Sequence, residues 1–228
     1  MTRPLTGARL VKSLERRFVT VNDDVRVGDR DVNILRPRSA EDLISETDFE
    51  RDERLPYWAE LWPSSTVLAN FVVADPRPRG RLIELGAGVG LVSIAAAIAG
   101  HAVTASDYYE DALAFARANS FRNLGYEIAT ALIDWRSVSP DLPRYDIVLA
   151  SDVLYESRYA PLVASVIDRL LAPRGIACVA DPGRVAANAF TDACTELELQ
   201  VTARVSRPYQ AGTVRQSITV YELSRAVS

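Results

Sequence analysis

The sequence predicts an α/β fold in which a mainly parallel sheet carries helices on both faces and ends in an antiparallel pair of strands. From residue 81 onward, short apolar runs with strand character alternate with helix-compatible runs over short links, which is typical of a parallel sheet. The last two strand-like runs have no helix between them, so they must pair antiparallel. A composition of 48% apolar and 25% charged residues is average for a globular chain.

The predicted elements of this region can be placed by residue number. We expect parallel strands at residues 81–85, 102–106, 127–132, 145–150 and 175–180. We expect helices at residues 91–99, 109–119 and 161–171, and an antiparallel pair at 197–204 and 213–223 with a link at 207–212. Because parallel strands end on the same edge of a sheet, the residues that follow them gather on one side of the molecule.

The N-terminal quarter of the chain has a different pattern. Apolar and polar residues alternate in the strand period at 18–21, 25–27 and 32–35, with turn residues at 22–24 and 28–29. This pattern predicts a small N-terminal β meander. Residues 38–55 are acidic and weakly patterned, as in a linker that lies over the surface. We expect one domain overall, in which residues 1–55 pack on a core formed by residues 56–228.

Charge and hydropathy exclude several classes of function. The formal net charge is −4, so no basic field is available to hold a phosphate backbone, and we expect no nucleic-acid partner. The longest apolar stretch, near residues 92–99, is too short to cross a bilayer, so we expect no membrane association. The first 20 residues lack the apolar core of a signal peptide, and the expected compartment is therefore the cytoplasm.

Cysteine and histidine are too few for a metal centre or a catalytic triad. Cys178 and Cys194 have no CxxC spacing and His101 is the only histidine, so we expect no zinc site and no other metal. A Ser-His-Asp or Cys-His mechanism would need His101, which lies in a tight link between two apolar runs. The chemistry is then left to carboxylates, aromatic rings and backbone groups.

A glycine loop follows the first parallel strand and opens a helix. In that place, Gly86, Gly88 and Gly90 can bring the backbone close to a ligand at a helix N-terminus. The loop departs from the dinucleotide fingerprint, because the third required glycine position holds Leu91 and Gly90 falls one residue early. A tight strand-to-helix turn without a ligand is the alternative interpretation.

Carboxylates lie at the ends of four predicted strands. They are Glu84, Asp107, Asp134 and Asp152. Ligands of an open parallel sheet bind beyond the carboxyl ends of its strands, where this negative charge would repel the pyrophosphate of a dinucleotide. It would favour a cation, and S-adenosylmethionine carries both a sulfonium and an ammonium. Electrostatics therefore favour S-adenosylmethionine over a nicotinamide cofactor.

Three of these carboxylates also have an alternative interpretation. Asp107 and Glu110 have capping-box spacing, so Asp107 either caps the next helix or holds a ribose diol, which we favour. Glu84 lies inside an apolar strand, where an unpaired carboxylate is costly, which favours a ligand or a backbone amine as its partner. Asp134 and Trp135 either form an ordinary turn or meet the edge of an adenine, which we favour.

Three motifs together carry a family resemblance. They are PYWAELWPSS at residues 56–65, ELGAGVGL at 84–91 and SDVLYE at 151–156. In this order they resemble methyltransferase family 16, the seven-strand protein-lysine methyltransferases. The ADPGR motif at residues 180–184 further resembles the branch that methylates the β subunit of electron-transfer flavoprotein. The resemblance runs from about residue 56 to the C-terminus and implies a Rossmann-like, seven-stranded class I methyltransferase sheet.

The resemblance implies contacts for individual residues. For the cofactor these are Trp62 along its length, Gly86, Ala87 and Gly88 at its methionine part, Asp107 at the ribose, Trp135 at the adenine and Ser151 at the floor of the site. Asp152 and Tyr155 match the acidic-x-x-aromatic signature of the family at the mouth where the substrate enters. Ser64 and Ser65 stand where the flavoprotein branch tends to carry glycines, which leaves the substrate open.

The tryptophans of the first motif need an interpretation of their own. Trp58 and Trp62 have the spacing of one helical face, but prolines on both sides of them argue against a continuous helix. We expect Trp62 to contact the cofactor and Trp58 to lie in the core. Ser64 or Ser65 is then expected to cap a helix that begins at Thr66.

The functional hypothesis is methyl transfer from S-adenosylmethionine to a lysine side chain of a protein substrate, with the electron-transfer flavoprotein β subunit as the named candidate. Asp152 would capture and orient the amine, and burial against Tyr155 would lower the pKa of that amine. A small-molecule N- or O-methyltransferase would share every cofactor residue. An NAD(P)-dependent oxidoreductase and a non-catalytic protein of the same fold are more remote alternatives.

The loop after the fifth parallel strand contains one further candidate. Asp181, Pro182 and Gly183 predict a tight turn. Arg184 either serves only that turn or contacts an acidic surface of the substrate.

Overall fold

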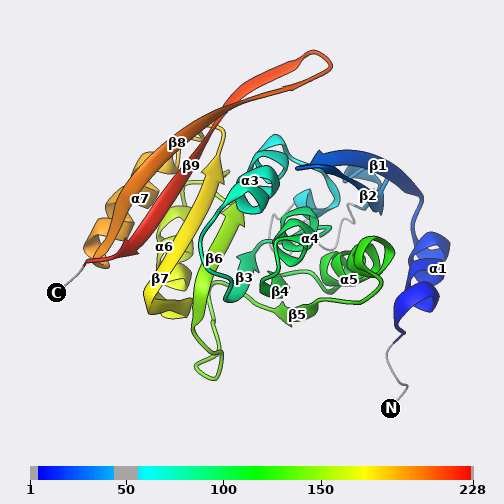
Figure 1. Cartoon of the computed structure of the whole chain (residues 1–228), viewed down its shortest axis with the longest axis horizontal. Helices are drawn as coiled ribbons and strands as arrows, with labels where there is room; N and C mark the ends of the chain where they lie inside the picture. The colour runs from blue at the N-terminus through cyan, green and yellow to red at the C-terminus, as the bar shows by residue number, and fades with distance from the viewer. Residues whose placement is uncertain (1–4, 44–55, 227–228) are drawn as a thin grey trace.

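A computed structural model describes residues 5–43 and 56–226, and its centre is a seven-stranded sheet with strand order β5-β4-β3-β6-β7-β9-β8 (Figure 1). The parallel strands are β3 (Arg81–Leu85), β4 (Ala102–Asp107), β5 (Ala129–Leu132), β6 (Tyr145–Ser151) and β7 (Leu171–Asp181). Two antiparallel strands, β9 (Val214–Arg225) and β8 (Leu199–Ala211), complete the sheet beside β7. The predicted fold class is confirmed.

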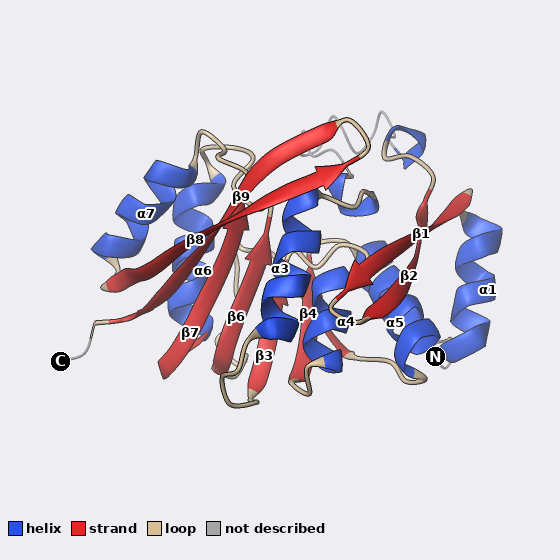
Figure 2. Ribbon diagram, turned by 45° about the horizontal axis from the view of Figure 1, so that its top comes forward, coloured by secondary structure: helices blue, strands red, loops and turns tan. Residues whose placement is uncertain are grey.

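Helices cover both faces of this sheet (Figure 2). One layer contains α3 (Pro63–Ala74), α4 (Leu91–Ile98) and α5 (Glu110–Leu124), and the other contains α6 (Tyr159–Leu170) and α7 (Ala187–Glu196). Successive strand residues point to opposite faces, so Leu82 is buried in the first layer and Ile83 in the second. The sequence did not predict α7. Within the described residues, no helix combines the length and the apolar character that a membrane crossing requires.

The predicted small N-terminal β sheet is present as a two-stranded hairpin, and a helix precedes it. This region contains α1 (Gly7–Arg17), β1 (Thr20–Val27), β2 (Arg30–Pro37) and a 3-10 turn, η1 (Glu41–Leu43). The turn expected at residues 22–24 is wrong, because these polar residues continue β1 and find partners on β2; Asp24, for example, accepts a hydrogen bond from Asn33. The α1 helix was not predicted, and it buries Leu10 and Leu14 against the main core. Most of the linker predicted at residues 38–55 lies outside the described residues.

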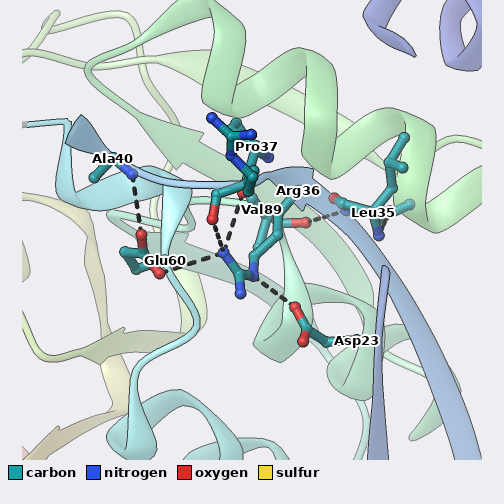
Figure 3. Close-up of polar contacts among 9 residues, drawn as sticks. Asp23, Leu35, Arg36, Pro37, Ala40, Glu60 and Val89 are labelled. Atoms are coloured by element: carbon teal, nitrogen blue, oxygen red, sulfur yellow. Dashed lines mark hydrogen bonds and ion pairs between the residues drawn. The ribbon is translucent and has the colours of Figure 1, made fainter. Parts of the chain in front are cut away.

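Two sets of hydrogen bonds connect this N-terminal hairpin to the edge of the sheet where the parallel strands end. The buried Asn119 of α5 accepts the backbone N–H of Leu35 and donates to the carbonyl oxygens of Leu35 and Val89, which ties β2 to the glycine loop. Glu60 accepts hydrogen bonds from Arg36 at 3.3 Å and from the backbone N–H of Ala40 at 3.0 Å (Figure 3). The N-terminal region therefore holds both the glycine loop and the segment at residues 56–65 that carries Trp58 and Trp62, called the tryptophan motif below.

The C-terminal hairpin is longer than the sequence indicated. The predicted link at residues 207–212 is wrong, since β8 continues to Ala211 and pairs residue by residue with β9. Polar residues in this region read as a loop, but each strand supplies the hydrogen-bonding partner of the other. Asp181, the last residue of β7, pairs with Thr219 of β9, so the rest of the hairpin reaches past the end of β7 (Figure 1).

Candidate active site

The glycine loop brings the backbone into close contact with the tryptophan motif. A Cβ atom at Gly88 would lie 3.0 Å from the carbonyl oxygen of Trp58, and Gly88 has a φ of +51° that side chains rarely adopt. A Cβ atom at Gly86 would lie 3.4 Å from the ring of Trp135. Gly86 also has a φ of +64°, and a Cβ there would lie 3.2 Å from Val153, so backbone conformation and close packing favour glycine at both positions.

Asp107, at the end of β4, holds the glycine loop in place. Its carboxylate accepts hydrogen bonds from the backbone N–H of Gly88 at 2.9 Å and of Tyr109 at 3.0 Å. Burial raises the pKa of Asp107 above its usual range, and these N–H groups oppose that rise. Asp107 does not cap the next helix, whose N-cap residue is Tyr109. The capping interpretation is therefore wrong.

Glu84 of β3 lies deeper, behind the loop. It is 1% exposed and accepts a hydrogen bond from the hydroxyl of Ser93 at 2.5 Å. Burial raises the pKa of Glu84 to about 8, and the contact with Ser93 only partly offsets this rise. The expected partner was a ligand or a backbone amine. In the structure Glu84 bonds to the hydroxyl of Ser93 in the first turn of α4, and a backbone hydrogen bond with Ser93 also lowers its pKa.

A cavity of about 110 Å³ opens beside the loop at the carboxyl ends of β3, β4 and β6. Seven predicted site residues line it: Trp62, Gly86, Asp107, Asp134, Trp135, Asp152 and Tyr155. Four others, Glu84, Ala87, Gly88 and Ser151, are absent from the lining that the described residues provide. A larger cavity of about 740 Å³ lies between α3 and the β8–β9 hairpin, but it contains none of the predicted site residues.

The tryptophan motif forms one wall of the cavity. It begins with a 3-10 turn, η2 (Tyr57–Ala59), and the indole N–H of Trp62 donates to the carbonyl oxygen of Tyr57 at 3.1 Å. Trp58 also lines the cavity, and its ring packs on Phe18 and Phe115 of the core. The prediction of a broken helix between the two prolines is confirmed, and both tryptophans reach the cavity wall.

The helix after this motif begins earlier than expected. It starts at Pro63, with Trp62 as its N-cap residue, because proline is well suited to the first helical turn. The predicted start at Thr66 with a serine cap is therefore wrong. Ser65 donates to the carbonyl oxygen of Trp62, and Ser64 donates to the carboxylate of Asp152.

Asp134 and Trp135 stand on the opposite wall. Asp134 forms an ion pair with Arg136 at 2.8 Å and accepts the backbone N–H of the same residue, which makes a compact turn. Trp135 packs edge-on against Tyr159, with ring centroids 5.9 Å apart. The turn interpretation of this segment and a ligand contact are thus compatible, since both side chains line the cavity.

A second cavity of about 170 Å³ adjoins the first. The residues that line both cavities are Tyr57, Trp62, Asp152 and Tyr155, whereas Glu156 and Arg184 line only the second. Tyr155 lies between the rings of Tyr57 and Tyr159, with centroid separations of 5.2 and 5.0 Å. Asp152 and Tyr155 therefore occupy the boundary between two compartments.

Several residues of this site were not found from the sequence. Tyr57, Tyr159 and Arg136 line the first cavity, and Ser64 holds Asp152. Tyr159 follows Tyr155 by four residues, a spacing that could have marked it. Ser64 gave no such signal, because its partner is 88 residues away in the chain.

The sequence also matches a protein family. The family described as lysine methyltransferase matches residues 47–194, about two thirds of the chain. The histone-arginine methyltransferase METTL23 of Xenopus laevis is 31% identical over 147 residues, which cover 60% of this chain and 61% of that protein. The electron transfer flavoprotein beta subunit lysine methyltransferase of Xenopus laevis is 27% identical over 137 residues, which cover 57% and 53%. The chain thus spans about three fifths or less of these relatives' length.

Solved structures show the same architecture. The magnesium protoporphyrin IX methyltransferase of Synechocystis PCC 6803, crystallised with S-adenosylmethionine, superposes with a TM-score of 0.58 at 19% sequence identity. The superposition covers 81% of this chain and 94% of that one. At this identity the likeness shows the fold, while the sequence match shows the family. The resemblance seen in the motifs is confirmed, and the chain belongs to the lysine methyltransferase family.

Proposed function

We propose that the protein is an S-adenosylmethionine-dependent methyltransferase that acts on a lysine side chain of another protein. The observation that carries this proposal is the pair of adjoining cavities with Asp152 and Tyr155 at their boundary. A methyl donor beside the glycine loop would face an acceptor in the second cavity across these two side chains. Membership of the lysine methyltransferase family supports the same function.

The first cavity fits the chemistry of this cofactor. Asp107 offers a buried carboxylate that suits the hydroxyl groups of a ribose, and the rings of Trp62 and Trp135 offer apolar surfaces for an adenine. The missing Cβ of Gly86 leaves room beside Trp135. The volume of about 110 Å³ is below the roughly 300–1,000 Å³ of small-molecule sites, so the lining side chains must move outward on binding.

The residues of this chain would contribute orientation and exclusion of water. When bound, the cofactor supplies a methyl group on a positively charged sulfur. Asp152 would orient the acceptor nitrogen, and the rings of Tyr57, Trp62 and Tyr155 would keep water from the boundary between the cavities. Proximity and orientation can lower a barrier by about 7–11 kcal/mol. A lysine amine with a reference pKa of about 10.4 costs roughly 4–5 kcal/mol to deprotonate at pH 7.

The relatives support a protein as the substrate, and they differ in the residue that they modify. One is named a histone-arginine methyltransferase and the other a lysine methyltransferase of the electron transfer flavoprotein beta subunit. We favour lysine because the family description names it and because the ADPGR motif resembles the flavoprotein branch. The beta subunit of electron-transfer flavoprotein is the first substrate to test. A cytoplasmic place of action is part of the proposal, and the free, buried Cys178 and Cys194 fit a reducing compartment.

The test is methyl transfer from tritiated S-adenosylmethionine to proteins of a host-cell lysate and to purified electron-transfer flavoprotein, followed by mass spectrometry of the labelled sites. The expected result is a labelled polypeptide with methylated lysine. The protein itself contains one lysine, Lys12, so self-labelling is easily recognised. Label found on arginine alone would show that arginine, and not lysine, is the acceptor. Label confined to small molecules, or none at all, would overturn the proposal.

A further inference from the structure

The carboxylate of Asp152 is already bound by a cation from another loop. Its Oδ1 atom accepts the Nε–H of Arg184 at 3.0 Å and the Nη2–H at 2.8 Å, and its Oδ2 atom accepts the hydroxyl of Ser64 at 3.0 Å. The side chain of Asp152 is 4% exposed. Asp152 also has a φ of +56°, an uncommon backbone conformation that is found at functional sites.

Arg184 is held firmly in this position. The carboxylate of Asp181 accepts the backbone N–H groups of Gly183 and Arg184, each at 2.7 Å, which fixes the loop after β7. The guanidinium lies 5.6 Å from the ring centroid of Trp62, within reach of a cation–π contact. The sequence left Arg184 as a turn residue or a contact for an acidic substrate. Its guanidinium instead lies between Asp152 and Trp62, at the wall of the second cavity.

The charge of this pair bears on the chemistry of an amine acceptor. A lysine amine attacks only in its neutral form, and a nearby carboxylate without a partner would raise the pKa of that amine by favouring the ammonium. A guanidinium beside the carboxylate cancels this effect. An acceptor that enters the second cavity therefore meets an ion pair of no net charge rather than an anion.

We propose that Arg184 is a positioning residue that neutralises Asp152 and so keeps the acceptor amine reactive near neutral pH. The inference rests on the proposed methyl transfer to lysine. In this account Asp152 orients the acceptor amine. Arg184 offsets the negative charge of Asp152, so the pKa of the amine is not raised.

The other titratable groups around the second cavity do not supply this balance. Glu156 pairs with Arg158 at 2.7 Å, and the rings of Tyr57 and nearby Tyr159 pack on Tyr155. Asp181 lies behind the loop, and burial raises its pKa above the usual range while the backbone N–H groups oppose this. Within the described part of the chain, Arg184 is the one cation that lines this cavity.

The test compares pH–rate profiles for kcat between pH 6.5 and 10, with electron-transfer flavoprotein or the lysate protein that wild type labels as acceptor. In Arg184→Gln we expect the ascending limb to move up by about one pH unit, so that kcat falls about tenfold near pH 7.5 and recovers at high pH. Arg184→Lys, which keeps the charge, should stay close to wild type. Arg26→Gln removes the same charge from an exposed pair with Asp31 in the N-terminal hairpin, outside the lining of both cavities, and it should leave the profile unchanged.

Each other outcome has a definite meaning. A fall in kcat that is equal at every pH would show a merely structural role and overturn the inference. A faster reaction or a lower KM near neutral pH would show that Arg184 occupies the place of the acceptor cation, which also overturns it. Where Arg184→Gln does not fold, Arg184→Met retains volume and gives the same test. A wild type that methylates no protein contradicts the proposed function, whereas an active wild type with unshifted variants contradicts this inference alone.

Discussion

Two carboxylates at the ends of strands that flank β3 have opposite kinds of partner. Asp107, after β4, is held by the neutral backbone N–H groups of Gly88 and Tyr109, whereas Asp152, after β6, is held by the cation of Arg184. The side beside the glycine loop therefore retains negative charge, and the side of the second cavity does not. This difference matches the proposed ligands, since the cofactor is a cation and the acceptor must be a neutral amine.

Glu84 lies on the same side as the glycine loop but carries little negative charge near neutral pH. It has a neutral partner, the hydroxyl of Ser93, and its pKa is raised to about 8. A buried carboxylate without a cation is costly in its charged form. Glu84 is therefore mostly protonated near neutral pH, and the negative charge proposed for this side depends on Asp107.

The largest expected effect concerns the stability of the fold. Because the pKa of Glu84 is about 8 in the folded chain and about 4.5 in the unfolded one, the folded state holds a proton that the unfolded state has lost between these values. The free energy of unfolding should therefore fall as pH rises, by about 4 kcal/mol from pH 5 to 8 for this group. Urea unfolding of wild type and Glu84→Gln at pH 5, 6.5 and 8 measures it. The glutamine variant should lose most of this fall, and equal slopes in the two proteins would contradict a neutral environment for Glu84.

The next effect is on catalysis. Asp152→Asn preserves shape but removes the charge that holds Arg184, so the acceptor loses its orientation and kcat should fall about 100-fold. Cofactor affinity, measured by calorimetry, should change little. Asp146→Asn is the matched control, since Asp146 lies at the opposite end of β6 and binds the backbone N–H of Arg81. Full turnover by Asp152→Asn would remove Asp152 from the acceptor site.

A substitution on the glycine-loop side should weaken cofactor binding. Asp107→Ala removes the carboxylate that holds Gly88 and is expected to contact the ribose, and charge-assisted hydrogen bonds of this kind contribute roughly 1.5–3 kcal/mol each. Affinity for S-adenosylmethionine should fall roughly 10- to 100-fold in a calorimetric titration. Asp111→Ala, which changes an exposed carboxylate of α5 that pairs with Arg17, is the control. Unchanged affinity in Asp107→Ala would contradict a role of this carboxylate in cofactor binding.

The smallest expected effect is at the boundary of the cavities. Tyr155→Ala removes a ring that packs on Tyr57 and Tyr159, and water would then reach the acceptor. We expect about a tenfold loss of kcat and a smaller loss of cofactor affinity, since the proposed role of the ring at the boundary is to keep water from the acceptor. Tyr126→Ala, at a ring that is 54% exposed and far along the chain, is the control. A larger loss of cofactor affinity than of kcat would move Tyr155 to the cofactor side.

The central sheet was predictable because its strands are short, apolar and separated by helices. The strand at residues 81–85 was placed at its true bounds, since a buried parallel strand reads as a continuous apolar run. The β8–β9 hairpin was shortened, because the pairing that makes residues 207–211 a strand depends on the partner and not on their own polarity. Helix α1 was missed because it is short and strongly charged, and only two leucines bury it.

The sequence predicts at which edge of the sheet the site lies, but not toward which face each side chain points. The sequence placed Asp107 and Asp152 at the carboxyl ends of strands, the family resemblance placed Trp62 beside the cofactor, and all three line the first cavity. Glu84 and Ser151 lie near the same edge without lining it, because strand position alone does not say which face a side chain takes. The ion pair of Arg184 with Asp152 joins loops that are 32 residues apart, and no local pattern encodes such a partner.

The most direct test of the central claim, that negative charge beside the glycine loop selects a cationic cofactor, is calorimetric titration of the protein with S-adenosylmethionine and with NADH. The charge distribution predicts saturable heat at one site with the sulfonium compound and none with the dinucleotide. Clear affinity for NADH together with no heat from S-adenosylmethionine would contradict it.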